Sequence, residues 1–175
     1  MDVIHTADFE TAVGSFRIAS TGLGLAYVQL PHASGRGFEG WRARHAPGVA
    51  VREGFEPNRL AIAQVVEFLE GKRDRFELPL DLRATPFQRQ VYGEVARIPF
   101  GETRTYAQIA SALGRPSATR AVGAANGANP VPLVVPCHRV IASNGHLQGY
   151  GGGLDLKARL LAMEQGRRCQ QGALL

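Results

Sequence analysis

Apolar and polar positions in the first thirty residues follow the pattern of a β-hairpin. The runs GSFRIAS and LGLAYVQL are rich in apolar and β-forming residues, and the short TGLG segment separates them. Two such runs joined by a Gly-containing turn predict two antiparallel strands. The next segment, residues 31–48, is rich in Gly, Arg and His, and we expect it to be a long loop.

A helical period follows between Asn58 and Gly71. Its apolar residues recur at i, i+3, i+4 and i+7: Ile62, Val65, Val66 and Leu69. This spacing predicts an amphipathic helix. The run FELPLDL alternates with period two, but Pro79 restricts it to an edge strand at best. Residues 1–83 are therefore predicted to form a small α/β domain.

The pattern changes at RATPFQRQVYGEV, where a second helical region begins. Thr85 is suited to cap a helix, and Pro86 is suited to its first turn. The apolar residues of this helix share one face: Phe87, Val91 and Val95. The helix is expected to stop before Pro99, because proline cannot continue it.

Two more short helices are predicted within TRTYAQIASALGRPSATRAVGAANGANP. Thr105 is expected to cap the first, Gly114 to follow its end, and Ser117 to cap the second. Each helix has an apolar stripe: Tyr106, Ile109, Ala110 and Leu113 in the first, and Ala118, Ala121, Val122 and Ala125 in the second. A tight turn between two helices is typical of a helix-turn-helix, although any αα-hairpin gives the same pattern.

The face of the second helix opposite its apolar stripe is almost bare. Arg120 stands there among Gly123, Ala124 and Gly127. Gly in a helix interior costs about 1 kcal/mol relative to Ala, and a solvated face normally carries several long polar side chains. A bare face with one cation favours close approach to a flat, negative surface such as a nucleic-acid backbone.

Composition limits the class of protein. The chain has 175 residues and 45% hydrophobic content, which suits one globular domain or two small ones. No apolar run reaches the roughly 18 residues of a membrane span, and the acidic start MDVIHTADFE is unlike a signal peptide. Two cysteines are too few for a disulfide scaffold, so we expect free thiols and a cytoplasmic location.

The net charge of +5 is unevenly distributed. Residues 1–83 contain ten basic and eleven acidic side chains, whereas residues 84–175 contain ten basic and four acidic ones. Eighteen of the twenty basic residues are Arg, whose guanidinium suits bidentate phosphate contacts. A preference for Arg codons could explain Arg over Lys but not the asymmetry. The second half is therefore a candidate nucleic-acid surface.

The run NPVPLVVPCHRVIAS sets Cys137 beside His138 in an apolar segment that contains three prolines. A buried Cys is by default a small hydrophobe, and a reactive one needs help to lose its proton. Neighbouring side chains of an extended chain point to opposite faces, so we expect His138 to reach the thiol through a bridging water. The prolines would hold the nucleophile in position by fixing φ.

Four potential metal ligands lie in this half of the chain: Cys137, His138, His146 and Cys169. Their spacing matches no structural zinc site, and adjacent Cys and His ligands fit a tetrahedron poorly. We therefore expect no zinc at this centre. The GYGGG run at 149–153 lacks the order and the Lys-Ser/Thr of a phosphate loop, and is predicted to be a turn that carries Tyr150.

Glu164 has two interpretations. It falls in the last turn of a helix predicted from about Leu154 to Gln165, just before Gly166. A carboxylate there opposes the helix dipole, so it is either an ordinary exposed residue or one held for a purpose. The functional alternative is a Cys-His-Glu relay in which Glu164 faces His138.

The segment PCHRVIAS, preceded by RAVGAANGANPVPLVV and followed by GYGGGLDLKARLLAMEQG, resembles the O6-alkylguanine-DNA alkyltransferases. The likeness runs from about Phe87 to Gly166, and the Pro-Cys-His-Arg-Val core is highly specific to that family. It implies a ribonuclease H-like α/β domain at 1–83 and a mostly α domain at 84–175. The latter would contain a helix-turn-helix at about 105–128 and the active-site motif at 136–140.

The resemblance implies direct reversal of DNA damage. An alkyl group would pass stoichiometrically and irreversibly from O6-methylguanine, or from O4-methylthymine, in double-stranded DNA to Cys137. The protein would bind the duplex by its minor groove and rotate the damaged base out of the stack. The resemblance implies no cofactor, no membrane and no obligate protein partner. The zinc site of some members has no counterpart in the Cys-free first half.

The resemblance also implies a role for each residue of the reaction. Cys137 is the nucleophile, His138 removes its proton through water, and Glu164 orients His138. Asn129 ties the recognition helix to the active-site segment. Tyr106 helps to rotate the nucleotide and donates a proton toward the base.

The remaining roles implied by the resemblance are contacts to DNA. Arg120 corresponds to the finger that enters the stack where the nucleotide leaves. Three residues match positions that contact the DNA backbone: Thr105, Arg115 and Ser143. Three more line the base pocket: Tyr150, Val140 and Gly151. Gly127 stands where some relatives carry an Arg.

Two rival functions remain from the residues themselves. A Cys-His hydrolase would need an oxyanion hole and a substrate cleft, and it leaves the helix-turn-helix pattern and the charge asymmetry unexplained. A DNA-binding regulator or damage sensor keeps the basic surface but gives the Cys-His pair no task.

Overall fold

The computed structural model describes residues 2–33 and 35–172, with side chains up to Cys169. The chain divides into two compact units, Met1–Arg83 and Ala84–Leu175. None of the helices in the described part is long and apolar enough to cross a membrane.

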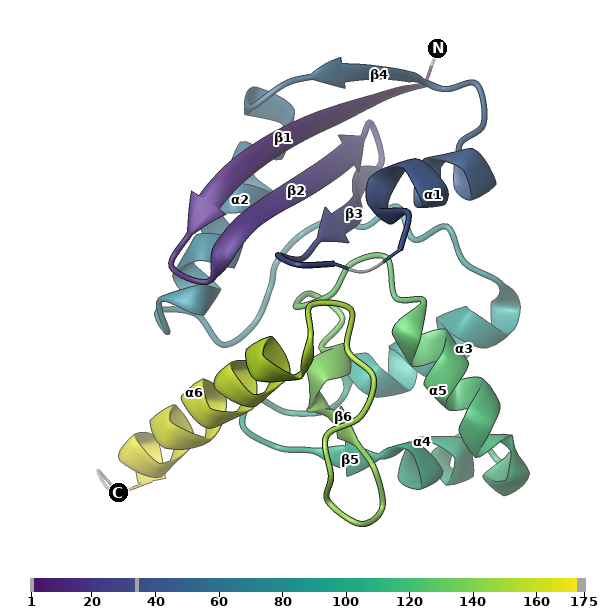
Figure 1. Cartoon of the computed structure of the whole chain (residues 1–175), viewed down its shortest axis with the longest axis vertical. Coiled ribbons are helices and arrows are strands. Elements are labelled where there is room, and N and C mark those ends of the chain that lie inside the picture. Colours follow the sequence, from purple (N-terminus) through teal and green to yellow (C-terminus); the bar gives the residue numbers. More distant parts are fainter. Residues whose placement is uncertain (1, 34, 173–175) are drawn as a thin grey trace. The chain divides into compact units, whose positions relative to one another are not determined.

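The first unit contains a four-stranded sheet (Figure 1). Its strands are β1 (Val3–Thr11), β2 (Gly14–Thr21), β3 (Gly24–Gln29) and β4 (Ala50–Glu53), in the order β3-β2-β1-β4. The pairs β1–β2 and β2–β3 are antiparallel, and β4 joins β1 in parallel. The predicted hairpin of β2 and β3 is confirmed, whereas β1 and β4 were not anticipated from the sequence.

Two helices pack on opposite faces of this sheet: α1 (Gly37–His45) and α2 (Arg59–Leu69) (Figure 1). A short 3₁₀ turn, η1 (Glu56–Asn58), leads into α2, whose position confirms the predicted helix. The expected loop at 31–48 is wrong over α1. Phe38 and Trp41 of α1 are buried against Ile4 and Ala19 of the sheet, and this tertiary packing overrides the weak helical propensity of the Gly-rich segment.

The run FELPLDL forms no regular strand. It meets the sheet at a single bridge between Leu25 and Leu80. Leu25 donates to the Pro79 carbonyl over 2.9 Å and accepts from the Asp81 amide over 2.9 Å. The proline restricts pairing to this one position, as expected for a residue without an N–H.

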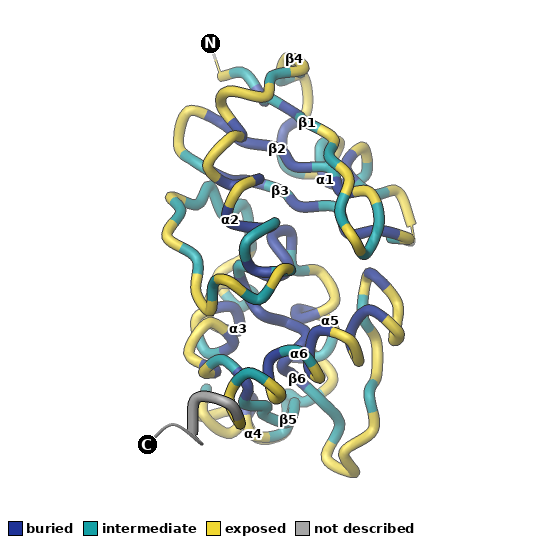
Figure 2. The backbone as a smooth tube through the Cα atoms, turned by 90° about the vertical axis from the view of Figure 1, so that its left-hand side faces the viewer, coloured by how far each residue is buried: buried dark blue, intermediate teal, exposed yellow. Residues whose placement is uncertain are grey.

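The second unit is mostly helical. Its elements are α3 (Pro86–Ala96), β5 (Arg104–Thr105), α4 (Tyr106–Ala112), η2 (Pro116–Ala118), α5 (Thr119–Gly127), η3 (Cys137–Arg139), β6 (Val140–Ile141) and α6 (Leu154–Gly172). The two short strands β5 and β6 pair in parallel. Residues 130–140 are buried at every position except the half-buried Val134 (Figure 2).

The starts of α3 and α4 are fixed by the same device. The hydroxyl of Thr85 accepts from the Gln88 amide, and the Gln88 side chain accepts from the Thr85 amide, which is a capping box. Thr105 and Gln108 repeat the arrangement at α4. Both predicted caps are thus confirmed. Gly114 follows the end of α4 with φ +69°, as its predicted place requires.

Two predicted helix ends are wrong. Ser117 does not cap α5, because Pro116 starts a 3₁₀ turn that takes Ser117 into its interior and leaves Ala118 at the cap. The last helix, α6, continues past Gly166. Arg167 lies over the Phe100 ring at 5.1 Å, and Arg168 pairs with Glu102, so side-chain contacts hold the extra turns.

Candidate active site

Cys137 lies in the tight turn η3, so the expectation of an extended segment at this position is wrong. Its amide donates to the Val135 carbonyl over 2.8 Å, and the Arg139 amide donates to the Pro136 carbonyl over 2.9 Å. These bonds close the turn around Cys137, which is only 5% exposed. The prolines bound the segment, and the hydrogen-bonded turn fixes the thiol within it.

Two asparagines anchor this turn to the end of α5. The Asn129 side chain donates to the Val135 carbonyl over 2.8 Å and accepts from the Val131 amide over 3.0 Å. The buried Asn126 donates to the carbonyl of Cys137 itself over 3.3 Å. Any shift of α5 is therefore transmitted directly to the backbone that carries the thiol.

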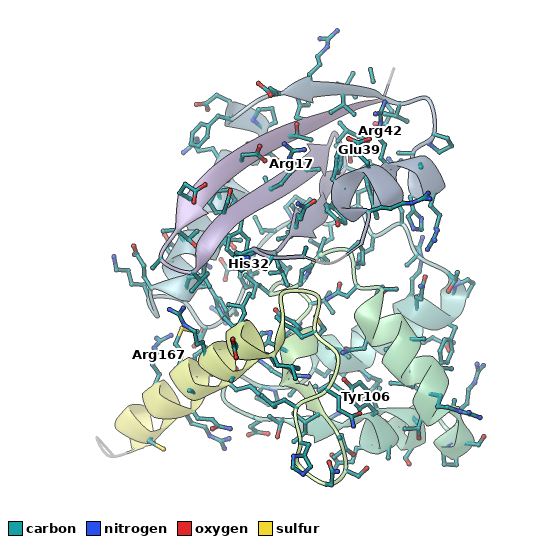
Figure 3. All side chains as sticks on the ribbon, viewed as in Figure 1. Arg17, His32, Glu39, Arg42, Tyr106 and Arg167 are labelled. Carbon is teal, nitrogen blue, oxygen red and sulfur yellow. The ribbon has the colours of Figure 1, made fainter. Side chains whose placement is uncertain are left out.

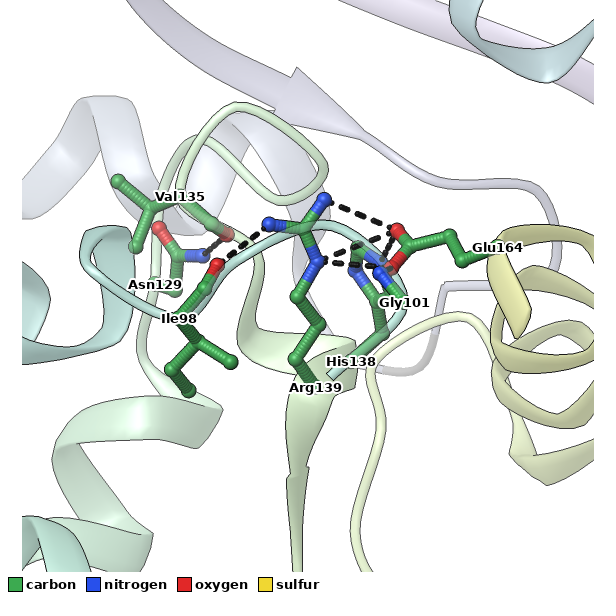
Figure 4. Close-up of polar contacts among 7 residues, drawn as sticks. All are labelled: Ile98, Gly101, Asn129, Val135, His138, Arg139 and Glu164. Carbon is green, nitrogen blue, oxygen red and sulfur yellow. Dashed lines mark hydrogen bonds and ion pairs between the residues drawn. The ribbon is translucent and has the colours of Figure 1, made fainter. Parts of the chain in front are cut away.

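His138, which follows Cys137 in the chain, forms a completely buried pair with Glu164 (Figure 4). Nε2 of His138 and Oε1 of Glu164 are 2.7 Å apart. Glu164 also accepts from the Gly101 amide over 2.9 Å and from the guanidinium of Arg139 through three contacts of 2.9–3.2 Å. Glu164 is thus neither in a last helical turn nor exposed, and it faces His138 as the relay interpretation requires.

Neighbouring groups offset only part of the rise in the Cys137 pKa that burial causes. Burial raises the pKa of Cys137 to about 11, although a hydrogen bond from Asn129 and the charge of Lys157 lower it. Burial also lowers the pKa of His138, against the opposite effect of Glu164. The resting pair at neutral pH is therefore a neutral thiol and a neutral imidazole. A proton acceptor is needed before the sulfur can react as a thiolate.

The carboxyl of Glu164 stays ionised despite its burial. Burial alone would raise its pKa, but the hydrogen bonds and charges of His138 and Arg139 outweigh that effect and leave the pKa below its ordinary value. An ionised Glu164 beside Nε2 requires that this nitrogen carry the proton. In a neutral ring, Nδ1 is then the nitrogen that can accept one.

Lys157 of α6 is a buried cation that the sequence did not reveal as part of the site. Its ammonium donates to the Val140 carbonyl over 2.7 Å and to the Gln148 carbonyl over 2.8 Å. Burial lowers its pKa, while the negative form of Cys137 raises it. Lys157 therefore fastens the segment after the active-site turn and places a positive charge near the sulfur.

Two tyrosines border the region between Cys137 and the 142–150 segment. The Tyr106 hydroxyl donates to the Gln148 carbonyl over 3.3 Å (Figure 3). The ring of Tyr150 meets the His138 ring edge-on with 6.4 Å between centroids. Its buried hydroxyl has no hydrogen-bond partner among the described residues. Of the other residues predicted to line a base pocket, Val140 is buried and Gly151 is exposed.

The residues predicted to contact DNA differ in exposure. Arg115, Arg120 and Ser143 are exposed, whereas Thr105 is half-buried and uses its hydroxyl to cap α4. The bare face of α5 is present: a Cβ at Gly127 would meet nothing within 4 Å, and one at Gly123 would meet only the Tyr106 ring at 3.9 Å.

The described residues contain no group of three or more side chains that could hold a metal ion. Cys137 and Cys169 are both free thiols, the first buried and the second exposed.

Comparison with known proteins identifies the family. The profile described as "6-O-methylguanine DNA methyltransferase, DNA binding domain" matches residues 86–166. The inducible methylated-DNA–protein-cysteine methyltransferase of Bacillus subtilis is 40% identical over 151 residues, 86% of this chain and 84% of the relative. The corresponding protein of Mycobacterium tuberculosis H37Rv is 38% identical over 165 residues, 94% of each chain. This chain belongs to the methylated-DNA–protein-cysteine methyltransferase family.

Solved structures agree with this assignment across both units. "Crystal structure of Mycobacterium tuberculosis OGT in complex with DNA" matches with a TM-score of 0.80 and 36% identity, covering 93% of this chain and 94% of that chain. The structure of the methyltransferase from Pyrococcus kodakaraensis matches with a TM-score of 0.66 and 27% identity, covering 92% and 98%. The small sheet followed by a helical unit is thus the fold of the methyltransferase family.

Sequence reasoning missed four residues of this methyltransferase site: Tyr92, Asn126, Arg139 and Lys157. Arg139 lies inside the PCHRV motif and could have been questioned as a charge in an apolar run. Lys157 occupies a position of α6 that faces Cys137 only in three dimensions. Tyr92 of α3 is buried with a hydroxyl that has no partner among the described residues, and burial, together with the negative form of Cys137, raises its pKa.

Proposed function

We propose that this protein repairs O6-alkylguanine in double-stranded DNA by moving the alkyl group to Cys137, once per molecule. The observation that carries the proposal is the buried His138–Glu164 pair, with its 2.7 Å contact, next in the chain to the buried Cys137 of a protein of this family. A neutral imidazole is the acceptor that a thiol with a pKa of about 11 requires.

The reaction balances without a cofactor. His138 takes the Cys137 proton through a water molecule, and the resulting thiolate attacks the alkyl carbon. The carbon–oxygen bond breaks, its electron pair stays on guanine O6, and a proton reaches the base from Tyr106. The new thioether has no acidic proton and is a poor leaving group, so the protein is consumed. O4-methylthymine presents the same alkyl–oxygen bond and is the expected second substrate.

Access to the base depends on the proposed DNA surface of the second unit. Helices α4 and α5 serve as a helix-turn-helix that meets the minor groove, and α5 lies closest to the DNA. Arg120 fills the stack after the nucleotide rotates out. The nearly bare face of α5 supports this close approach. Thr105, Arg115 and Ser143 contact the backbone, and Gly127 supplies no such contact.

The base itself occupies a pocket next to Cys137, lined by Tyr150, Val140 and Gly151. Asn129 keeps the thiol in register with α5. The first unit is a ribonuclease H-like domain with no direct part in the chemistry. Because a free thiol must survive until it meets damage, the cytoplasm remains the expected location.

The proposal is tested by reacting the full chain with a duplex that contains one O6-methylguanine. Mass spectrometry should find a gain of one methyl group per molecule, mapped to Cys137, with restored guanine in the DNA. Cys137→Ser should bind the duplex and gain nothing, whereas Cys169→Ser should react normally. Repeated turnover would favour a hydrolase, and binding without any adduct would favour a damage sensor.

A further inference from the structure

Arg139 is the most extensively bonded charged residue of the active-site turn among those described. Its guanidinium donates to both oxygens of Glu164 over 2.9–3.2 Å and to the Ile98 carbonyl over 2.7 Å (Figure 4). The side chain is buried, and it also lies 5.6 Å from the centroid of the Phe100 ring. Arg139 therefore joins the end of α3, the active-site turn and α6.

The position of this cation decides how Glu164 acts on His138. A buried carboxylate with His138 as its sole partner would draw a proton onto the imidazole, because an unpaired buried charge costs several kcal/mol. With Arg139 in bidentate contact, the carboxylate is already neutralised. Glu164 can then accept from Nε2 without pulling a second proton onto the ring.

We propose that Arg139 is a positioning residue that holds Glu164 ionised against Nε2 of His138 while keeping the imidazole neutral, so that Nδ1 receives the Cys137 proton. This role rests on the proposed alkyl transfer. Without Arg139, the ring would be protonated at rest in a larger fraction of molecules, and a protonated ring cannot accept the thiol proton.

The charged groups that face His138 act on its protonation in opposite directions. Glu164 of α6 favours the protonated ring, whereas Arg139 of η3 and Lys157 of α6 disfavour it. The neutral Tyr150 meets the ring edge-on, and Cys137 adjoins it in the chain. Lys157 is held by two backbone carbonyls, so it cannot replace Arg139 at the Glu164 carboxylate.

The test is the pH dependence of alkyl transfer from free O6-benzylguanine base, which needs no base flipping. The rate should fall at low pH as His138 becomes protonated. In Arg139→Met this acidic limb should move upward by at least about one pH unit, because loss of a contacting charge changes a pKa by about one to three units. Arg139→Lys keeps the charge, so it should keep the limb and lose only rate.

Glu164→Gln allows the charge of Arg139 to be examined without leaving a buried carboxylate unpaired. In the double variant, Arg139→Met with Glu164→Gln, the rate should begin to fall at a higher pH than in Glu164→Gln alone. This pair decides the question even if Arg139→Met does not fold. The matched control is Arg168→Met, which removes an exposed guanidinium paired with Glu102 and should leave the limb in place.

The result that would overturn the proposal is an unchanged limb in both comparisons, with only stability reduced. Arg139 would then serve folding alone. Nitrogen NMR of His138 in the unreacted protein gives the same titration without relying on turnover. Failure of the alkyl transfer itself is distinguishable, because the wild-type protein would then show no adduct on Cys137 at any pH.

Discussion

The two units of this protein differ in how deeply they bury charged side chains. Several ion pairs of the first unit keep contact with water: Asp8 and Arg17 are 55% and 39% exposed, and Glu39 and Arg42 of α1 are 68% and 36% exposed (Figure 3). The less exposed pair of Asp81 and Arg83 still keeps 11% and 20%. In the second unit Glu164 is fully buried and Arg139 is only 7% exposed. Among the described residues, every buried His, Arg, Lys or Glu belongs to the second unit: His138, Arg139, Lys157 and Glu164.

The difference separates residues that keep a fold soluble from those that prepare a reaction. Exposed ion pairs contribute little to stability, whereas buried ones are retained at a cost in desolvation. The buried polar residues of the first unit are uncharged: Thr6, Ser20, Thr21, Asn58 and Gln64. Among the described residues, the first unit thus buries no charged side chain, whereas the buried charges of the second unit lie in the active-site turn and in α6.

The largest effect is expected when one partner of the buried ion pair is removed, in comparison with removal of one partner of an exposed pair. Glu164→Ala should lower the free energy of unfolding by about 3–5 kcal/mol, because it leaves Arg139 buried without a counter-charge. Asp8→Ala should cost less than about 1 kcal/mol, because Arg17 can turn to water. Urea unfolding of the full chain measures both. Equal losses would contradict the proposed division between the units.

Alkaline pH should destabilise the protein through Cys137. Its pKa is about 11 in the folded chain against 9.0 ordinarily, so the unfolded state loses a proton first and stability falls as pH rises from about 9 to 11. The loss should reach about 2–3 kcal/mol, at 1.4 kcal/mol for each pKa unit. Tyr27 of the first unit also has a raised pKa, so the comparison must be with Cys137→Ala, whose curve should be flatter.

Arg120→Ala should slow alkyl transfer from duplex DNA without slowing transfer from the free base. Transfer from methylated duplex should slow by about tenfold to a hundredfold, since rotation of a base costs a few kcal/mol that Arg120 helps to offset. Transfer from free O6-benzylguanine should be unchanged. Rate constants from single-turnover experiments decide this, and equal losses on both substrates would assign Arg120 to folding or chemistry.

The smallest effect concerns long-range charge. Binding of undamaged duplex should weaken with salt by about −0.9 in log K against log salt for each phosphate contacted. Arg115→Ala should reduce this slope by about one, and Arg17→Ala in the first unit should not change it. Fluorescence anisotropy over a salt series makes the comparison. A slope that responds to Arg17 instead would move the DNA surface to the first unit.

Local signals in the sequence predicted local structure well. Thr85 and Thr105 were identified as caps because a capping box needs only residues three positions apart. Ser117 was misassigned because Pro116 allowed a 3₁₀ turn that spacing alone does not distinguish from a helix start. Helix α1 was missed because its stability comes from Phe38 and Trp41 packing on a distant sheet.

The residues of the site likewise divide into those predicted from the sequence and those that depend on tertiary packing. Cys137, His138 and Glu164 were recognisable through a family motif, and the 2.7 Å contact between the last two gives the relay its geometry. The Arg139–Glu164 pair joins residues 25 positions apart, and Lys157 meets the Gln148 carbonyl across a turn. No periodic pattern encodes such contacts, because they depend on how α6 packs against the active-site turn.

The low exposure of Cys137 also bears on how long one molecule remains usable. Each molecule carries a single acceptor, so any thiol lost to an oxidant or a stray electrophile is one repair that never occurs. A sulfur that is 5% exposed and protonated at neutral pH reacts slowly with such agents, since the thiolate is the reactive form. The exposed Cys169 is not protected by burial in this way. If Cys137 is the acceptor, as proposed, its burial extends the time over which an unreacted molecule stays able to repair DNA.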